Sequence, residues 1–331
     1  MNDHRHMAHA LTLARRGHGN TWPNPAVGCV LVRDDVVVGR GWTQPGGRPH
    51  AEAMALAQAG AAACGATAYV TLEPCAHHGK TPPCAEALVR AGVVRVVSAL
   101  TDPDPRVAGR GHAMLRQAGI CVTENICARQ AGRDQVGFLT RITRGRPMLT
   151  LKLASSFDGR IATASGESQW ITGPAARRHA HMLRLTHDAV MVGGETARID
   201  RPALNVRGLG RVRQPVRVIV SNRDLPPLPP EDSAHGPLWH LRGSVADVMS
   251  ELGRRGVTRV LCEGGGKLAA SLLAADMVDQ LVGYCAGITL GGDGLPTIAS
   301  LGLNRLADAP RFELVELRSL GGDVLHRWQR A

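Results

Sequence analysis

His50-Ala51-Glu52, followed by Thr-Leu-Glu-Pro-Cys-Ala-His-His-Gly-Lys-Thr-Pro-Pro-Cys at residues 71–84, decides the fold of the first half of this chain. His50 and Glu52 lie where the apolar pattern predicts that a helix begins. Cys75 follows a predicted strand, and Cys84 lies at the start of the next predicted helix. Because all these side chains lie at the ends of elements, we expect them to converge at one edge of a layered domain.

The residue types at this edge are those of a catalytic zinc site. Such a site has three protein ligands and keeps a fourth position for water. His50, Cys75 and Cys84 supply three ligands, and Glu52 is close enough to move protons. The helix start at Cys84 is expected to favour its thiolate. A structural zinc site or two buried cysteines is the alternative interpretation, but a structural zinc would need a fourth ligand.

The sequence around these motifs predicts alternating helices and strands, which indicates a layered α/β domain. The predicted elements are a helix over 4–16, a hairpin of strands 27–32 and 36–38, a helix from Ala51, a strand over 68–71, a helix from Pro83, a strand over 93–99, a helix after Gly111 and a strand near Ile120.

A second domain is predicted after Thr143-Arg144-Gly145-Arg146-Pro147, because this short polar segment precedes a new apolar strand. We therefore expect domains at 1–145 and 147–331. The strands predicted for the second domain are 148–154, 189–192, 216–220, 257–262, 281–285 and a closing pair around Gly321-Gly322.

Composition excludes several classes of protein. The 331 residues are 44% hydrophobic and 20% charged, with eight cysteines and a formal net charge of +11. The chain has no apolar run of about 18 residues and too few cysteines for a disulfide scaffold, so we expect a folded cytoplasmic protein without a membrane partner. The scattered positive charge suits a phosphorylated substrate. Lysine occurs three times among 39 basic residues, at Lys80, Lys152 and Lys267, and each lies inside a motif.

Together with Asn24-Pro25-Ala26-Val27-Gly28, the zinc motifs resemble the deaminase domain of the bifunctional riboflavin biosynthesis enzymes, in which a long spacing between the two cysteines is characteristic. The resemblance covers roughly residues 1–145 and implies a cytidine-deaminase-like α/β/α fold. It also implies that Asn24 contacts the pyrimidine and that His77 and Lys80 lie at the substrate, with Lys80 near its phosphate. Two positions depart from the pattern. Thr43 stands where relatives often carry histidine, and Asp104 stands where they carry asparagine or histidine.

Four further stretches resemble the reductase domain of the same family, which has a dihydrofolate-reductase-like α/β fold. They are LKLASSFDGRIA at 151–162, SQWITG at 168–173, HMLRLTHDAVMVGGETARIDRPALNVR at 181–207 and LCEGGGKLAASLL at 261–273. The resemblance implies cofactor contacts from Ala154, Trp170, Thr196 and Asp200. It implies substrate contacts from Lys152, Ser168, Arg184, Leu204, Arg207 and Glu263, with Lys152 and Asp200 as catalytic candidates.

The glycine-rich turn of this second domain is a candidate anion site. Glu263-Gly264-Gly265-Gly266-Lys267 ends a predicted strand and opens a helix, so its backbone amides could hold phosphate oxygens. It matches neither common nucleotide-binding glycine motif, and a turn without a ligand remains an open alternative. Ser221 and Arg223 follow the strand at 216–220 and are candidates for the 2′-phosphate of NADPH.

The implied reactions are two consecutive steps. Water activated by Zn²⁺ would deaminate 2,5-diamino-6-ribosylamino-4(3H)-pyrimidinone 5′-phosphate, and NADPH would then reduce the ribosyl chain to give 5-amino-6-ribitylamino-uracil 5′-phosphate. The expected partners are the phosphorylated pyrimidine and further copies of the same chain. A nucleic-acid-editing zinc deaminase with an accessory domain and a non-catalytic zinc module that binds nucleic acid are the alternatives. The cysteine spacing, the second domain and the scarcity of aromatic residues disfavour both.

Overall fold

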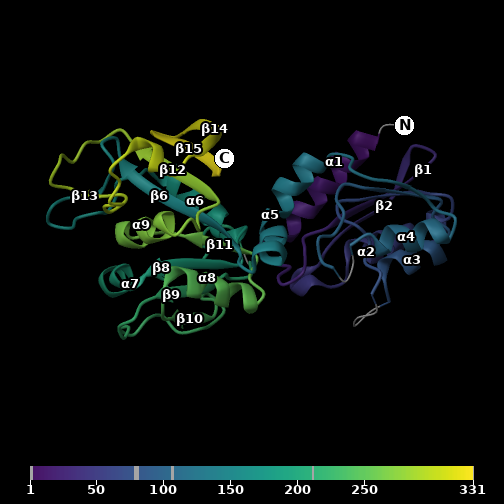
Figure 1. Ribbon diagram of the computed structural model, residues 1–331, viewed down its shortest axis with the longest axis horizontal. Helices are drawn as coiled ribbons and strands as arrows, with labels where there is room; N and C mark the ends of the chain where they lie inside the picture. Colours follow the sequence, from purple (N-terminus) through teal and green to yellow (C-terminus); the bar gives the residue numbers. More distant parts are fainter. Residues whose placement is uncertain (1–2, 78–81, 106–107, 211, 331) are drawn as a thin grey trace. The chain divides into compact units, whose positions relative to one another are not determined.

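The computed structural model describes residues 3–77, 82–105, 108–210 and 212–330. The chain divides into two compact units, Met1–Gly145 and Arg146–Ala331. Each unit has its own sheet (Figure 1).

The first unit is built on a mixed five-stranded sheet with the order β2-β1-β3-β4-β5. β1 pairs antiparallel with β2 and β3, whereas β3, β4 and β5 run parallel. Its elements in chain order are α1 (Asp3–Ala14), η1 (Arg15–Gly17), β1 (Gly28–Arg33), β2 (Val36–Trp42), η2 (Pro45–Gly47), α2 (Ala51–Ala59), η3 (Gly60–Ala63), β3 (Thr67–Val70), α3 (Cys84–Arg90), β4 (Arg95–Ser98), α4 (Arg110–Gln117), β5 (Cys121–Thr123) and α5 (Ala128–Arg144).

Helices cover both faces of this sheet, because alternate side chains of the strands enter two separate cores. On one face, strand residues pack with side chains of α2, α3 and α4, among them Cys29, Leu31, Ala55, Val70, Leu88 and Leu115. On the other face, strand residues pack mainly with α1 and the start of α5, among them Met7, Leu11, Val30, Tyr69, Val97 and Ala131. The first unit is therefore an α/β/α sandwich.

Helix α2 lies directly on β2 because Gly41 has no side chain. A Cβ atom at Gly41 would lie 2.0 Å from the carbonyl oxygen of Ala51 and 2.7 Å from the backbone nitrogen of Ala55. Ala51 is the first residue of α2 and stands between His50 and Glu52. The close approach at Gly41 therefore sets the position of the helix start that carries both side chains.

The second unit contains an eight-stranded sheet with the order β10-β9-β8-β11-β6-β12-β15-β14 (Figure 1). The six strands from β10 to β12 are parallel, and the β14–β15 hairpin adds an antiparallel edge. Its elements are β6 (Met148–Ser156), β7 (Arg160–Ala162), α6 (Pro174–Leu185), β8 (Ala189–Gly193), α7 (Gly194–Asp200), β9 (Val216–Val220), β10 (Leu238–Leu241), α8 (Val245–Arg254), β11 (Arg259–Cys262), α9 (Gly266–Ala274), β12 (Gln280–Ala286), β13 (Leu295–Pro296), η4 (Leu306–Asp308), β14 (Phe312–Leu320) and β15 (Asp323–Arg330).

The topology brings three predicted segments of the second unit to one edge of its sheet. β9, β8 and β11 are parallel, so their carboxyl ends lie side by side. Ser221–Arg223 follows β9, the Gly193-Gly194 turn joins β8 to α7, and Glu263 follows β11. This edge is the candidate cofactor site.

Candidate active sites

The three predicted zinc ligands meet in the first unit. His50 is the N-cap of α2, Cys84 is the first residue of α3, and Cys75 lies between β3 and α3. His50 Nδ1 lies 3.7 Å from Cys75 Sγ and 3.3 Å from Cys84 Sγ, and the three ligand atoms are all within 4.8 Å of one another. Ordinary Zn–N and Zn–S bonds in a tetrahedron place nitrogen and sulfur about 3.6 Å apart. The donor set therefore fits one zinc ion with three protein ligands.

Cys75 is the thiol that favours the negative charge when no metal is bound. A hydrogen bond with the Cys84 side chain, another with His50 and the Cys84 N–H, 3.3 Å from Cys75 Sγ, lower the pKa of Cys75 to about 4. The same Cys75 sulfur and burial raise the pKa of Cys84. We had expected the start of α3 to favour the thiolate of Cys84. Instead, the backbone N–H of Cys84, which is the first of α3, donates to the sulfur of Cys75. A bound zinc ion would hold both sulfurs as thiolates.

Glu52 lies in the first turn of α2 and is buried. Burial and the adjacent Cys75 raise the pKa of Glu52. Its carboxyl group is not part of the three-residue ligand group. A buried acid next to a metal site, with a raised pKa, has the properties of a proton carrier.

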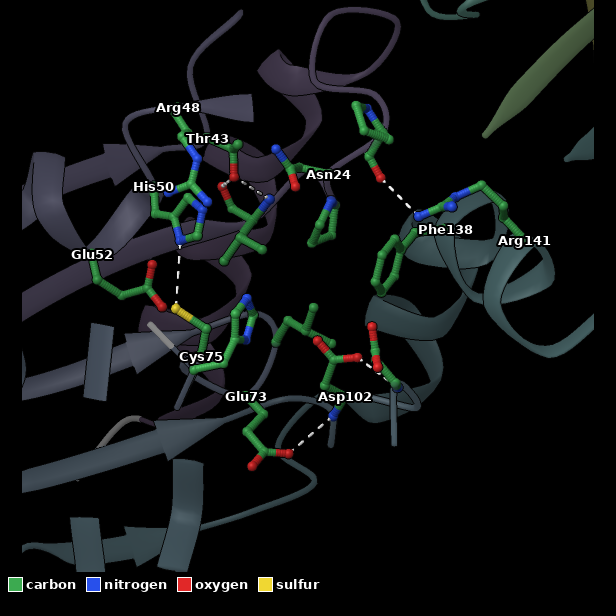
Figure 2. A pocket seen from close by; sticks show the side chains of 16 residues that line it. Asn24, Thr43, Arg48, His50, Glu52, Glu73, Cys75, Asp102, Phe138 and Arg141 are labelled. Carbon is green, nitrogen blue, oxygen red and sulfur yellow. Dashed lines mark hydrogen bonds between the residues drawn. The ribbon is translucent and has the colours of Figure 1, made fainter. Parts of the chain in front are cut away.

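A cavity of about 310 Å³ adjoins His50, Glu52 and Cys75 (Figure 2). Of the predicted substrate residues, Asn24 and His77 line it, and Lys80 lies outside the described residues. Its lining consists of Pro23, Asn24, Pro25, Val27, Thr43, Arg48, His50, Glu52, Leu72, Glu73, Cys75, His77, Asp102, Asp104, Phe138 and Arg141.

Both departures from the family pattern lie in this cavity. The Thr43 hydroxyl accepts the Val27 N–H at 3.0 Å and is 3.4 Å from the Val27 carbonyl oxygen, so its hydrogen-bonding capacity is used by the backbone. The Asp104 N–H donates to Asp102 Oδ1 at 2.9 Å. Burial, together with the nearby charges of Asp104 and Glu73, raises the pKa of Asp102 to about 6 although the Asp104 N–H opposes this rise.

The sequence analysis missed four lining residues, Arg48, Asp102, Phe138 and Arg141. Phe138 and Arg141 both belong to α5, and Arg141 Nη2 donates to the Pro23 carbonyl oxygen at 3.0 Å (Figure 2). The strong amphipathic pattern of residues 128–144 was the available signal, because it predicts a helix with one face on the domain. Arg48 and Arg141 add positive charge to a cavity that also holds two aspartates.

In the second unit, the predicted substrate residues Lys152, Arg184 and Glu263 form a buried charge cluster. Arg184 donates from Nε and Nη2 to the two Glu263 oxygens, and Lys152 Nζ lies 3.8 Å from Glu263 Oε2. Burial alone would raise the pKa of Glu263, but Arg184 and Lys152 outweigh it and lower this pKa to about 2. Glu263 is therefore a charge partner of Lys152 in this cluster. Arg184 Nη1 also donates to the Asn205 carbonyl oxygen at 2.7 Å.

The glycine-rich turn adopts a backbone that requires glycine. Gly264 and Gly265 have φ values of 113° and 64°. The Gly193 N–H donates to the Gly264 carbonyl oxygen at 3.2 Å, and a Cβ atom at Gly265 would lie 3.0 Å from Thr196 Oγ1. The structure thus brings together three predicted cofactor residues, Gly264, Gly265 and Thr196. Lys267 instead pairs with Glu195 at 2.9 Å on an exposed surface.

Ser221 is occupied by its own neighbours. Its hydroxyl donates to the Arg223 carbonyl oxygen at 2.9 Å and accepts the Arg223 N–H at 3.1 Å. Arg198 Nη1, which the sequence analysis did not single out, lies 3.3 Å from the same oxygen. The Arg223 side chain is exposed. Arg198 and Arg223 are therefore guanidinium groups of this turn, and Arg242 Nη1 also donates to the Asn222 carbonyl oxygen at 3.0 Å.

The remaining predicted residues of the second unit have varied surroundings. Trp170 is 67% exposed and its ring centre lies 4.5 Å from the guanidinium carbon of Arg177. Ser168, Asp200 and Arg207 are exposed, whereas Leu204 is buried with a φ of 52°. Ala154 lies on β6, two residues beyond Lys152. Although Asp200 is exposed as a residue, partial desolvation of its carboxyl group raises the pKa of Asp200.

Comparison with known proteins explains why one chain holds both sites. Residues 1–100 match the cytidine and deoxycytidylate deaminase zinc-binding region, and residues 147–326 match the RibD C-terminal domain. The riboflavin biosynthesis protein RibD of Escherichia coli is 42% identical, with 98% of each chain covered. The chain belongs to the RibD family. The structure of Acinetobacter baumannii RibD has a TM-score of 0.90 and 40% identity, with 99% of each chain covered.

Family membership confirms the main predictions from sequence. The chain is a bifunctional deaminase and reductase of riboflavin biosynthesis, with a cytidine-deaminase-like first domain and a RibD-type reductase domain. A Thermotoga maritima relative, 32% identical with a TM-score of 0.88 over 99% of each chain, has the same two-domain structure. These similarities do not support the nucleic-acid-editing alternative. Within the described residues, every helix is too short or too polar to cross a bilayer.

Proposed function

We propose that the domain at 1–145 deaminates 2,5-diamino-6-ribosylamino-4(3H)-pyrimidinone 5′-phosphate. The domain at 147–331 then uses NADPH to give 5-amino-6-ribitylamino-uracil 5′-phosphate. The printed name of the Thermotoga maritima relative, a diaminohydroxyphosphoribosylaminopyrimidine deaminase and 5-amino-6-(5-phosphoribosylamino)uracil reductase, supports this substrate. The observation that carries the proposal is the three-ligand metal set beside buried Glu52 at a cavity of about 310 Å³, which suits a single pyrimidine nucleotide.

His50, Cys75 and Cys84 would hold Zn²⁺, which when bound supplies an activated water. Glu52 would carry protons to the pyrimidine ring nitrogen and to the departing amino group, because its carboxyl group is buried beside His50 and Cys75. Asn24 orients the pyrimidine. His77 and Lys80 contact the substrate, with Lys80 near its phosphate, and Arg48 and Arg141 strengthen the positive field on the cavity wall.

In the reductase domain, substrate binding is assigned to Lys152, Ser168, Arg184, Leu204, Arg207 and Glu263. Lys152 and Asp200 are the catalytic candidates. Because Arg184 is held by Glu263 and Asn205, the exposed Arg207 is the better candidate for the substrate phosphate.

The NADPH site is assigned to the carboxyl edge of the parallel strands, and NADPH when bound supplies the hydride. The residues proposed to hold it are Ala154, Trp170, Thr196, Asp200, Ser221, Arg223, Gly264, Gly265, Gly266 and Lys267. The two glycines with positive φ form the turn at this edge, and Arg198 extends the basic surroundings of Ser221.

We also propose that the enzyme works in the cytoplasm as a homo-oligomer. All eight cysteines are free thiols, which suits a reducing compartment. Leu314 and Leu317 on the edge strand β14 are 48% and 63% exposed, which is consistent with an apolar contact between copies.

The test is to assay both half-reactions with the purified full-length chain, before and after treatment with a zinc chelator. We expect the chelator to abolish ammonia release from the diamino substrate. NADPH oxidation with the deaminated intermediate should continue, because the two sites belong to separate units. Ammonia release that survives complete zinc removal, or no reduction of the deaminated intermediate by the intact enzyme, would refute the proposal.

A further inference from the structure

Glu73 is a buried carboxylate that none of the steps above uses. It lies two residues before the zinc ligand Cys75 and is 4% exposed. Its two oxygens accept four backbone N–H groups from one distant segment. Oε2 accepts from Asp102 at 3.1 Å and Gly109 at 2.9 Å, and Oε1 accepts from Gly111 at 2.8 Å and His112 at 3.3 Å.

These four hydrogen bonds join the two ends of the segment from Asp102 to His112. Gly109 is the N-cap of α4, and Gly111 and His112 belong to its first turn, so Glu73 satisfies amides that the helix leaves unpaired. The Asp102 amide lies at the other end of the segment. A single carboxylate therefore links Asp102 to the start of α4.

The start of α4 also packs against the chain between Glu73 and the proposed zinc ligand. A Cβ atom at Gly111 would lie 2.0 Å from the Pro74 carbonyl oxygen, so the backbones of α4 and of Pro74 are in direct contact. Cys75 follows Pro74 immediately. The start of α4 is thus fixed to the backbone that carries Cys75.

Asp102 is the residue at the end of this segment that lines the proposed substrate cavity. Figure 2 shows its N–H directed to Glu73 while its carboxyl group faces the cavity beside His50 and Cys75. A carboxylate in that place can accept hydrogen bonds from the amino or ring N–H groups of a pyrimidine. Since Asp102 lies in a connection between β4 and α4, its position depends on what holds that connection.

We propose that Glu73 is a positioning residue for the deaminase: by binding the amides of Asp102 and of the start of α4, it holds the Asp102 carboxyl group at the pyrimidine, at a fixed distance from the zinc ligands. This inference rests on the proposed function for its substrate and adds a residue whose two carboxyl oxygens are both engaged by backbone N–H groups. Its effect is expected mainly on substrate binding.

The test replaces Glu73 by glutamine, which has the same shape but puts an NH₂ group against two backbone N–H groups. In the full-length enzyme with zinc bound, Glu73→Gln should raise the deaminase KM at least tenfold and change kcat much less. Zinc content and the reductase kinetics should stay unchanged. Glu73→Asp, which keeps the charge with one methylene less, should give a smaller rise and serves if Glu73→Gln does not fold.

A double-mutant cycle separates positioning from general stability. If Glu73 acts through Asp102, the Glu73→Gln/Asp102→Asn double variant should have nearly the KM of Asp102→Asn alone. Asp188→Asn is the matched control. Asp188 is a buried carboxylate in the other unit that accepts the backbone N–H groups of Thr258 and Arg259, and its loss should leave the deaminase KM unchanged.

Hydrogen exchange supplies a measurement that needs no substrate. Glu73→Gln should speed amide exchange over 102–112 while the zinc-ligand peptides keep their protection. The inference is overturned if the two substitutions raise the deaminase KM additively, or if Glu73→Gln loses zinc. It is also overturned if Glu73→Gln changes neither the KM nor the amide exchange. If the wild-type enzyme does not deaminate the proposed substrate, the proposed function is refuted. Faster amide exchange over 102–112 in Glu73→Gln would still establish that Glu73 holds the amides of Asp102 and of the start of α4.

Discussion

The buried cluster around Glu263 should make a large, pH-dependent contribution to the stability of the reductase unit. Glu263 lies within hydrogen-bonding distance of Arg184 and 3.8 Å from Lys152, and its pKa is lowered from 4.5 to about 2. A shift of this size corresponds to about 3 kcal/mol at neutral pH. Glu263→Gln should therefore lower the free energy of unfolding of this unit by about 3 kcal/mol, since it leaves Arg184 buried without its counter-ion.

The sign of the pH dependence follows from the direction of the shift. Because the pKa of Glu263 is depressed in the folded state, its contribution is present above pH 4.5 and is lost as the pH falls toward 2. The stability difference between wild type and Glu263→Gln should shrink to about 1 kcal/mol at pH 3.

The assay is urea denaturation at both pH values, with amide exchange of β6 and β11 peptides measured by mass spectrometry so that the reductase unit is followed separately. Glu195→Gln is the control, because Glu195 pairs with Lys267 where both side chains are more than half exposed, and should cost less than about 1 kcal/mol. A Glu263→Gln variant within 1 kcal/mol of wild type at pH 7, or a difference that does not change with pH, would refute this argument.

Three further predictions concern the proposed sites. Glu52→Gln should keep its zinc, measured by metal analysis, and lose about 10²–10⁴-fold in deaminase kcat, and loss of the metal would contradict its role as a proton carrier. Cys75→Ser and Cys84→Ser should both lower zinc content while NADPH oxidation with the deaminated intermediate survives, and retained zinc would exclude them as ligands. Arg223→Ala should weaken NADPH binding roughly 10–150-fold in a fluorescence titration and leave NADH binding nearly unchanged. If Arg198→Ala shows that pattern instead, the 2′-phosphate is bound from α7.

Residue patterns were sufficient for most strands and for the placement of His50 and Cys84 at helix starts. The apolar run at 216–220 coincides with β9, and His50 and Cys84 stand at helix starts as predicted. These features depend on local sequence, because strand burial and helix capping are set by neighbouring residues.

Local patterns did not reveal the parts of the site that depend on tertiary contacts. The linker expected from Thr143 begins inside the last turn of α5, because the helix continues to Arg144 and ends at Gly145 in a left-handed conformation. The sequence analysis assigned no helix over 128–144, and for that reason it also missed Phe138 and Arg141 as lining residues of the cavity. The pairing of Arg184 with Glu263 joins residues 79 positions apart, and no local pattern predicts such a partner.

Gly41 shows why a catalogue of chemical groups is an incomplete description of this enzyme. It carries no functional atom and lies on the edge strand of the first sheet, yet a single added methyl group would collide with the carbonyl oxygen between the histidine ligand and the proton carrier. A substitution of Gly41 by alanine looks conservative in size and lies on a residue without a functional group. Replacing Gly41 by alanine should therefore act as an active-site change, because the start of α2, which carries His50 and Glu52, can approach β2 this closely only where a Cβ atom is absent.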